Sequence, residues 1–244
     1  MTETSLNTLL DGRVKIHQPV TGYRAGMDAV MLAASLAARP GEHLVEFGCG
    51  SGAALLCAAR RLNDVSFSAF EIDPVAADLA RRNVVENALD GRVEVIEADI
   101  AALIQERVAD QVFFNPPFFD DPAALRLPKV EKQRAWLSGH APLPVWIKSA
   151  ARALRSKGYL TVIHRADALP AILAALDREF GSFVIKPIQA KAGQPAKRVI
   201  VKARKGGRAP AVLLESLILH DDGKRVYSPA ADAIMHGSAL VLDA

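Results

Sequence analysis

The chain has 244 residues, of which 50% are hydrophobic and 23% charged, a composition typical of a globular protein with a sizeable core. The N-terminus has no basic and apolar leader, and no apolar run is long enough to span a bilayer, so we expect a cytoplasmic protein. Cys49 and Cys57 have neither a CxxC nor a metal-ligand spacing, which favours a reduced protein and predicts no metal site. The net charge of +3 is compatible with a polyanionic partner but does not require one.

The pattern of apolar segments alternates strand and helix along the chain, which predicts an α/β fold. We expect strands at 43–47, 66–72, 92–97, 111–114, 159–164, 183–188 and 198–203. We expect helices at 53–62, at 74–86, at 144–154, and at 167–179 with Asp167 as the cap. The loop between the last two strands is too short for a crossover helix, so the last strand should be antiparallel. The sequence thus predicts one domain, 1–244, with a seven-stranded, mostly parallel sheet and helices on both faces. Its core is 39–208, the extension 1–38 covers the cofactor site, and 209–244 follows.

A glycine-rich turn follows the first expected strand and opens the first expected helix. It contains Glu46, Gly48, Gly50 and Gly52. Glycines allow a tight turn and a close approach of the backbone to a ligand. The spacing is GxGxG with an acid two residues before it, not the GxGxxG of dinucleotide folds. We infer a cofactor without a pyrophosphate, whose ammonium group the Glu46 carboxylate can hold. The alternative is a turn that binds nothing.

Two further carboxylates fall at the ends of the next strands. Glu71 ends the second strand, where an acid can accept both hydroxyls of a ribose, and Asp99 follows the third, where it can accept from an adenine amine. The alternatives are a surface carboxylate for Glu71 and a loop cap for Asp99. Asp73 more simply caps the helix that Pro74 begins.

The tetrapeptide Asn115-Pro116-Pro117-Phe118 follows the fourth strand. Two prolines fix the backbone and remove donors, so the Pro116 carbonyl and the Asn115 side-chain oxygen are held as acceptors. Together they can grip the two hydrogens of a planar amine and aim its lone pair at a methyl donor, while Phe118 offers a face for stacking. These four are the expected catalytic residues, and Asn115 also borders the cofactor. The alternative is a plain Pro-Pro turn.

The segment from Ser182 to Arg208 holds eight Lys or Arg and no Asp or Glu. We expect Lys191, Lys197 and Arg198 to contact RNA, with a solvated basic face as the alternative. Strand alternation sends the basic side chains of this run to both faces, so only part of it can form one patch.

Residues 48–52, Glu71, Asp99 and the Asn-Pro-Pro-Phe tetrapeptide together resemble class I S-adenosylmethionine (SAM)-dependent amino-methyltransferases. The wider chain, from about residue 10 to 237, is similar to the bacterial family of tRNA (adenine-N6) methyltransferases that modify an adenine next to the anticodon of a valine tRNA. The segments that carry this likeness are 18–32, 196–206 and 219–229. The chain departs from the best-known members at Phe118, where they have Tyr.

The resemblance implies a SAM-dependent methyltransferase with a Rossmann-like fold that acts on the exocyclic amine of a nucleobase, most simply adenine N6 in a tRNA. It also implies that Tyr23, Arg24, Gly26 and Asp28 flank the cofactor pocket, although Asp28 could instead cap a helix and Gly26 could form the turn before it. The alternatives for the acceptor are a protein glutamine amide, or a small molecule methylated on oxygen.

Overall fold

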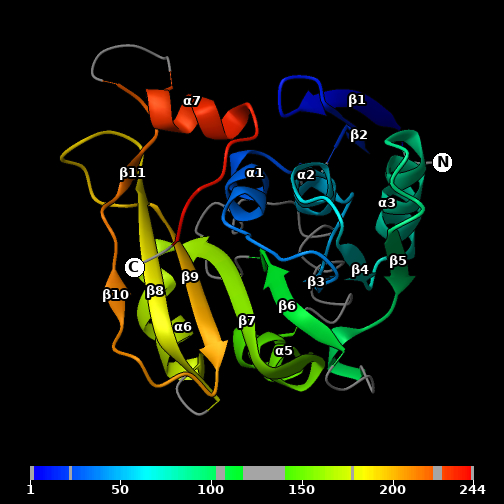
Figure 1. Cartoon of the computed structure of the whole chain (residues 1–244). Coiled ribbons are helices and arrows are strands. Elements are labelled where there is room, and N and C mark those ends of the chain that lie inside the picture. The colour runs from blue at the N-terminus through cyan, green and yellow to red at the C-terminus, as the bar shows by residue number, and fades with distance from the viewer. Residues whose placement is uncertain are drawn as a thin grey trace.

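A twisted sheet divides the molecule into two layers of helices (Figure 1). The computed structural model describes residues 3–21, 24–102, 108–117, 141–176, 179–221 and 227–242. The strands of the sheet are β3 (His43–Phe47), β4 (Ser66–Glu71), β5 (Val93–Glu97), β6 (Ala109–Phe114), β7 (Leu154–Arg165), β8 (Phe180–Gln189), β9 (Arg198–Lys205), β10 (Val212–Leu213) and β11 (Leu217–Ile218).

The order of the strands is β10-β8-β9-β7-β6-β3-β4-β5, and β11 also pairs with β8. The pairs β3–β4, β4–β5, β3–β6 and β6–β7 are parallel, whereas β9 lies antiparallel between β7 and β8. The seven expected strands and the antiparallel last one are therefore confirmed. The expected total of seven was wrong, because within the described part of the chain β10 and β11 extend the sheet beyond β8 to nine strands. Each has only two residues, too few to show an alternating pattern in the sequence.

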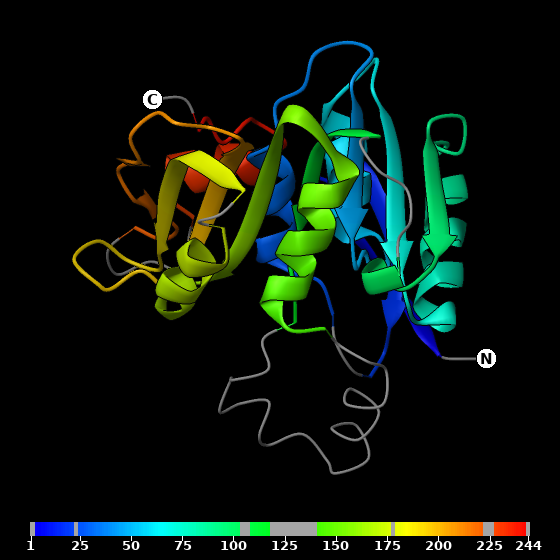
Figure 2. The ribbon, with the colours of Figure 1, turned by 90° about the horizontal axis from the view of Figure 1, so that it is seen from below.

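Two hydrophobic cores fill the space between the sheet and its helices. On one face lie α1 (Met27–Ala34), α2 (Ala53–Arg61), α3 (Pro74–Glu86) and α7 (Pro229–Met235), and on the other η1 (Ile100–Ala102), α5 (Leu143–Ala153), η3 (Ala166–Ala168) and α6 (Leu169–Leu176). Figure 2 shows this division from below. Neighbouring side chains of β6 enter opposite cores, Phe113 with α1 to α3 and Phe114 with α5, and both are fully buried. A strand buried on both faces reads as a continuous apolar run, which is why β6 was found from the sequence.

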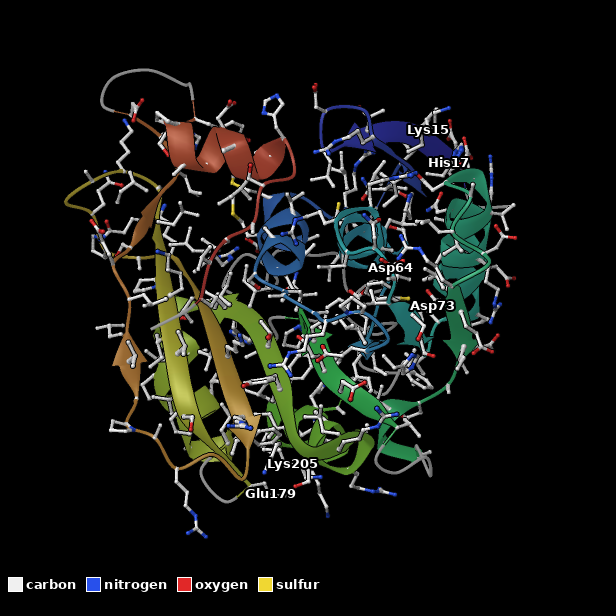
Figure 3. The ribbon with its side chains drawn as sticks, viewed as in Figure 1. Lys15, His17, Asp64, Asp73, Glu179 and Lys205 are labelled. Carbon is white, nitrogen blue, oxygen red and sulfur yellow. The ribbon has the colours of Figure 1, made fainter. Side chains whose placement is uncertain are left out.

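An N-terminal hairpin, β1 (Thr4–Leu9) and β2 (Val14–Pro19), packs against α2 and α3. The Asn83 side chain of α3 joins three segments there: its Nδ2 donates to the carbonyls of His17 and Ser51 at 2.9 Å each, and its Oδ1 accepts from the His17 amide at 2.8 Å. Figure 3 shows His17 and Lys15 beside α3. Because Ser51 belongs to the glycine-rich turn, the Asn83 side chain links the hairpin to that turn.

The helix expected at 167–179 differs from the observed structure. Asp167 does not cap it, because it lies within η3 and pairs with Arg165, and α6 begins at Leu169. Both oxygens of the Asp167 carboxylate accept from the Arg165 guanidinium, a charge-assisted pair with two bonds. The caps of two other helices follow the ordinary rule: Asp73 accepts from Val75 at the start of α3, as expected, and Ser228 accepts from Ala231 at the start of α7.

Candidate cofactor and acceptor site

The glycine-rich turn connects β3 to α2 at the end of β3. Gly48, Gly50 and Gly52 all have positive φ, at 62°, 55° and 89°. A Cβ on Gly48 would lie 2.5 Å from Cη2 of Trp146, whereas a Cβ on Gly50 would meet nothing within 4 Å. Gly48 is therefore required by packing against the indole, and Gly50 borders open space.

Glu46 is the last acid before the turn, and its side chain is 3% exposed. Its Oε2 has no hydrogen-bond partner within the described part of the chain. Burial raises the pKa of Glu46 well above 4.5, the nearby Glu71 charge raises it further, and the Leu55 amide opposes the shift. A buried carboxylate oxygen without a donor is costly, and an ammonium group would supply that donor.

Glu71 at the end of β4 clamps the same turn. Its Oε2 accepts from the Gly50 amide at 2.7 Å and its Oε1 accepts from the Asp73 amide at 3.0 Å. The sequence predicts a ribose ligand for this carboxylate but not these backbone bonds. A carboxylate has about four lone-pair sites, so each oxygen retains room for a second donor.

Asp99 lies just beyond β5 and lines a small hollow with Gly48, Phe70, Ile72 and Trp146. Its Oδ1 also accepts from the Ala101 amide at 2.8 Å, so the loop-cap alternative is confirmed without removing the side chain from the hollow.

Trp146 also lines this hollow, although it belongs to none of the sequence motifs. It is buried, its Nε1 donates to the Ala141 carbonyl at 2.9 Å, and its ring lies 5.3 Å from that of Phe114. It comes from α5, about 100 residues from the glycine turn, and its ring lies against Gly48. Trp146 therefore packs in the core and also forms part of the wall of the hollow.

Asn115 continues β6 beside the glycine turn. Phe47 of β3 is in register with Phe114 of parallel β6, so Gly48 and Asn115 leave adjacent strands side by side. Asn115 is half-buried, Pro116 is buried and Pro117 is exposed. Phe118 lies outside the described residues. The acceptor and cofactor motifs thus meet at the carboxyl edge of the sheet, where open α/β folds bind ligands.

Residues 24–28, which the resemblance places beside the cofactor pocket, contact β1 and β9 in the structure. Arg24 donates to the side chains of Ser5 and Asn7 in β1, at 3.0 and 2.6 Å, and Gly26 forms the turn before α1. Asp28 does not cap α1; it forms an ion pair with Arg198, Oδ2 to Nε 2.8 Å. Tyr23 lies outside the described residues.

The basic run divides among several environments. Arg198 pairs with Asp28, while Lys191 and Lys197 are exposed in the loop between β8 and β9. Lys202 and Arg204 lie over the ring of Tyr159, at 4.9 and 5.7 Å from its centroid. The run as a whole is therefore not one surface, as alternation along a strand predicts.

Two searches of the described residues have simple results. No group of three or more His, Cys, Asp and Glu side chains there could hold a metal ion. No described helix has the length and hydropathy needed to cross a membrane.

The chain matches a family model, Methyltransferase small domain, over residues 25–134. Among its relatives, a tRNA1(Val) (adenine(37)-N6)-methyltransferase of Phocaeicola vulgatus is 31% identical over 180 residues, 73% of this chain and 75% of the relative. A Haemophilus influenzae protein of the same name is 26% identical over 220 residues, 88% of this chain and 90% of the relative.

Solved structures show the same fold. An Agrobacterium tumefaciens protein described as a predicted O-methyltransferase superposes with a TM-score of 0.75 at 27% identity, over 89% of this chain and all of that one. A tRNA (m1A58) methyltransferase of Aquifex aeolicus superposes with a TM-score of 0.55 over 77% of this chain and 72% of its own. Its 15% identity supports the class I SAM-methyltransferase fold alone.

Proposed function

This chain belongs to the family of the tRNA1(Val) (adenine(37)-N6)-methyltransferases, and we propose that it transfers a methyl group from SAM to the N6 amine of an adenine in a tRNA. The observation that carries this proposal is the register of β3 and β6. Because Phe47 pairs with Phe114, the glycine turn and Asn115 emerge next to each other. A methyl donor held over the turn and an amine held at Asn115 would then meet.

We propose that the residues around the turn hold SAM. The unpartnered Glu46 oxygen would accept from the ammonium group of SAM. The open space beside Gly50 would leave room for SAM to lie close to the backbone of the turn. Glu71 would accept from the ribose hydroxyls. Asp99, in the hollow between Ile72 and Trp146, would accept from the adenine amine of the cofactor. When bound, SAM supplies an electrophilic methyl on a sulfonium, so the protein needs no strong base.

The acceptor amine would be oriented by Asn115 and Pro116. The amide oxygen of Asn115 and the carbonyl of Pro116 each accept one N–H, which leaves the lone pair of the nitrogen directed at the methyl group. The prolines hold both acceptors rigidly, and this positioning is the main catalytic contribution. Phe118 would stack on the base. The cofactor would be bordered from the N-terminal side by Tyr23, Gly26 and Asp28, while Arg24 holds the hairpin in place. The RNA would be faced by Lys191, Lys197 and Arg198.

The test offers three acceptor classes to the purified chain with tritiated SAM: total tRNA, bulk protein and a panel of phenols. The proposal expects label in tRNA, recovered after nuclease digestion as N6-methyladenosine. Asn115→Ala should lower this label by roughly 100-fold or more, because it removes one of two amine acceptors. Binding of S-adenosylhomocysteine, measured by calorimetry, checks that the variant is folded. Label confined to a phenol or to a protein amide would overturn the proposal.

A further inference from the structure

The C-terminal segment brings a pair of aromatic rings to the edge of the sheet that carries the site. β11 extends β8, and the amides of Leu219 and His220 donate to the carbonyls of Gln189 and Ala190 at 2.9 and 3.0 Å. Since β8 and β6 both run parallel to β7 in this sheet, Gln189 lies at the same edge as Asn115.

The two rings are fixed against each other. His220 and Tyr227 pair through their backbones, and their rings stack 5.3 Å apart at 17°. Ser228 anchors the pair, because its amide donates to Leu219 at 2.9 Å and its hydroxyl donates to Ile218 at 2.6 Å. Nδ1 of His220 is buried without a partner among the described residues. If the two rings served only to pack against each other, an aromatic ring without a polar atom would avoid this unsatisfied buried nitrogen. The histidine at position 220 therefore needs another explanation.

Two lysines extend this surface along the adjacent loop. Lys191 and Lys197 are exposed, and the loop from 190 to 197 contains no Asp or Glu. The backbone of Lys197 is held at both sides, since its amide donates to Ile188 at 3.0 Å and its carbonyl accepts from Ala166 at 3.1 Å. The positive charge of Lys197 therefore extends from a hydrogen-bonded backbone. Asp221, an acidic residue, is exposed beside His220.

We propose that His220, Tyr227, Lys191 and Lys197 form a second contact for single-stranded RNA, separate from the site of methyl transfer. The proposal rests on the proposed function. Unstacked bases stack on aromatic rings, and lysines neutralise the phosphates between them, which is the chemistry of single-strand binding. Four strand spacings separate β6 from β11 across β7, β9 and β8, about 19 Å. The surface therefore binds nucleotides that flank the target adenine and does not touch the reacting atoms.

The test measures binding of a fluorescein-labelled RNA stem-loop with the sequence of a valine anticodon arm, without cofactor, over a series of salt concentrations. Tyr227→Leu keeps apolar volume but removes the ring, and it should weaken binding by roughly 5- to 150-fold, while Tyr227→Phe should bind as the parent does. Lys191→Ala should lower the salt slope by about one. The charge-matched control is Lys15→Ala, on the hairpin at the opposite side of the molecule, which should leave the affinity unchanged (Figure 3). Asp221→Asn should tighten binding.

Steady-state methylation of tRNA separates this contact from the reaction site. Tyr227→Leu and Lys191→Ala should raise KM for the RNA and leave kcat near the parent value. The inference would be overturned if both variants bound the stem-loop with the affinity of the parent. It would also be overturned if a fully duplex RNA bound as tightly as the stem-loop and Tyr227→Leu did not change its affinity. A parent chain that binds the stem-loop with these dependences but transfers no methyl group to tRNA would refute the proposed function and leave the inference standing.

Discussion

Substituting Gly48 by alanine tests the packing of the glycine turn against α5. Two penalties add at this position. The residue has a φ of +62°, which costs an L-residue about 1–2 kcal/mol. The new methyl would also lie 2.5 Å from the Trp146 ring, which is buried and has no room to retreat without disturbing Phe114. Forcing an extra methyl into a packed core costs about 1–3 kcal/mol.

We therefore expect Gly48→Ala to lower the free energy of unfolding by about 2–5 kcal/mol. Gly41→Ala is the matched control, because Gly41 has a φ of +83° and nothing within 4 Å of its Cβ position. The control pays the backbone penalty alone, so the difference between the two variants isolates the clash.

Urea denaturation followed by circular dichroism measures both variants. If Gly48→Ala is no less stable than Gly41→Ala, the contact with Trp146 does not constrain the turn and the reasoning is refuted. Adding Trp146→Leu to Gly48→Ala should remove the clash, so the double variant should be less unstable than the two single losses added together.

Three further predictions follow from the contacts of the site. Glu46→Gln should flatten the pH dependence of the stability of the ligand-free protein. The pKa of Glu46 in the folded protein is raised above 4.5, so the parent's free energy of unfolding falls as the pH rises from 4.5 through that raised pKa. Urea titrations of the variant that show the parent's slope with pH would contradict this. Asn83→Ala should cost about 2–4 kcal/mol, because it leaves partly buried groups of His17 and Ser51 without partners, and a loss below about 0.5 kcal/mol in the same assay would show that water replaces them. Asp28→Asn should cost less than about 1 kcal/mol, since the pair with Arg198 is part-exposed and screened, and a larger loss in thermal melts would assign that pair a structural role.

The sequence predicts the central sheet well because its strands carry strong local signals. Buried parallel strands such as β6 are continuous apolar runs, and the glycine turn is a backbone requirement that only glycine meets. The sequence does not reveal the hairpin or the two short strands beyond β8. These elements are held by long-range bonds, such as the one from the His17 amide of the hairpin to Asn83.

The candidate site follows the same division. Placement at strand ends brings Glu46, Glu71 and Asn115 to one edge, as the motifs predict. The sequence does not predict the contacts around the site, because Asp28 binds a residue 170 positions away and Trp146 enters from α5. Which charges pair across the fold depends on tertiary packing, and residue spacing contains no record of it.

The way the hairpin is attached bears on how this protein can be shortened. Val14 and Ile16 are fully buried against helices, and the Asn83 side chain bonds both to His17 of the hairpin and to the carbonyl of Ser51. Excising residues 1–38 would expose the apolar surface that Val14 and Ile16 cover and would leave Asn83 without its partner His17. The middle of the chain is thus not a transplantable module, and minimal enzymes or domain fusions built on this scaffold should retain the N-terminal strands.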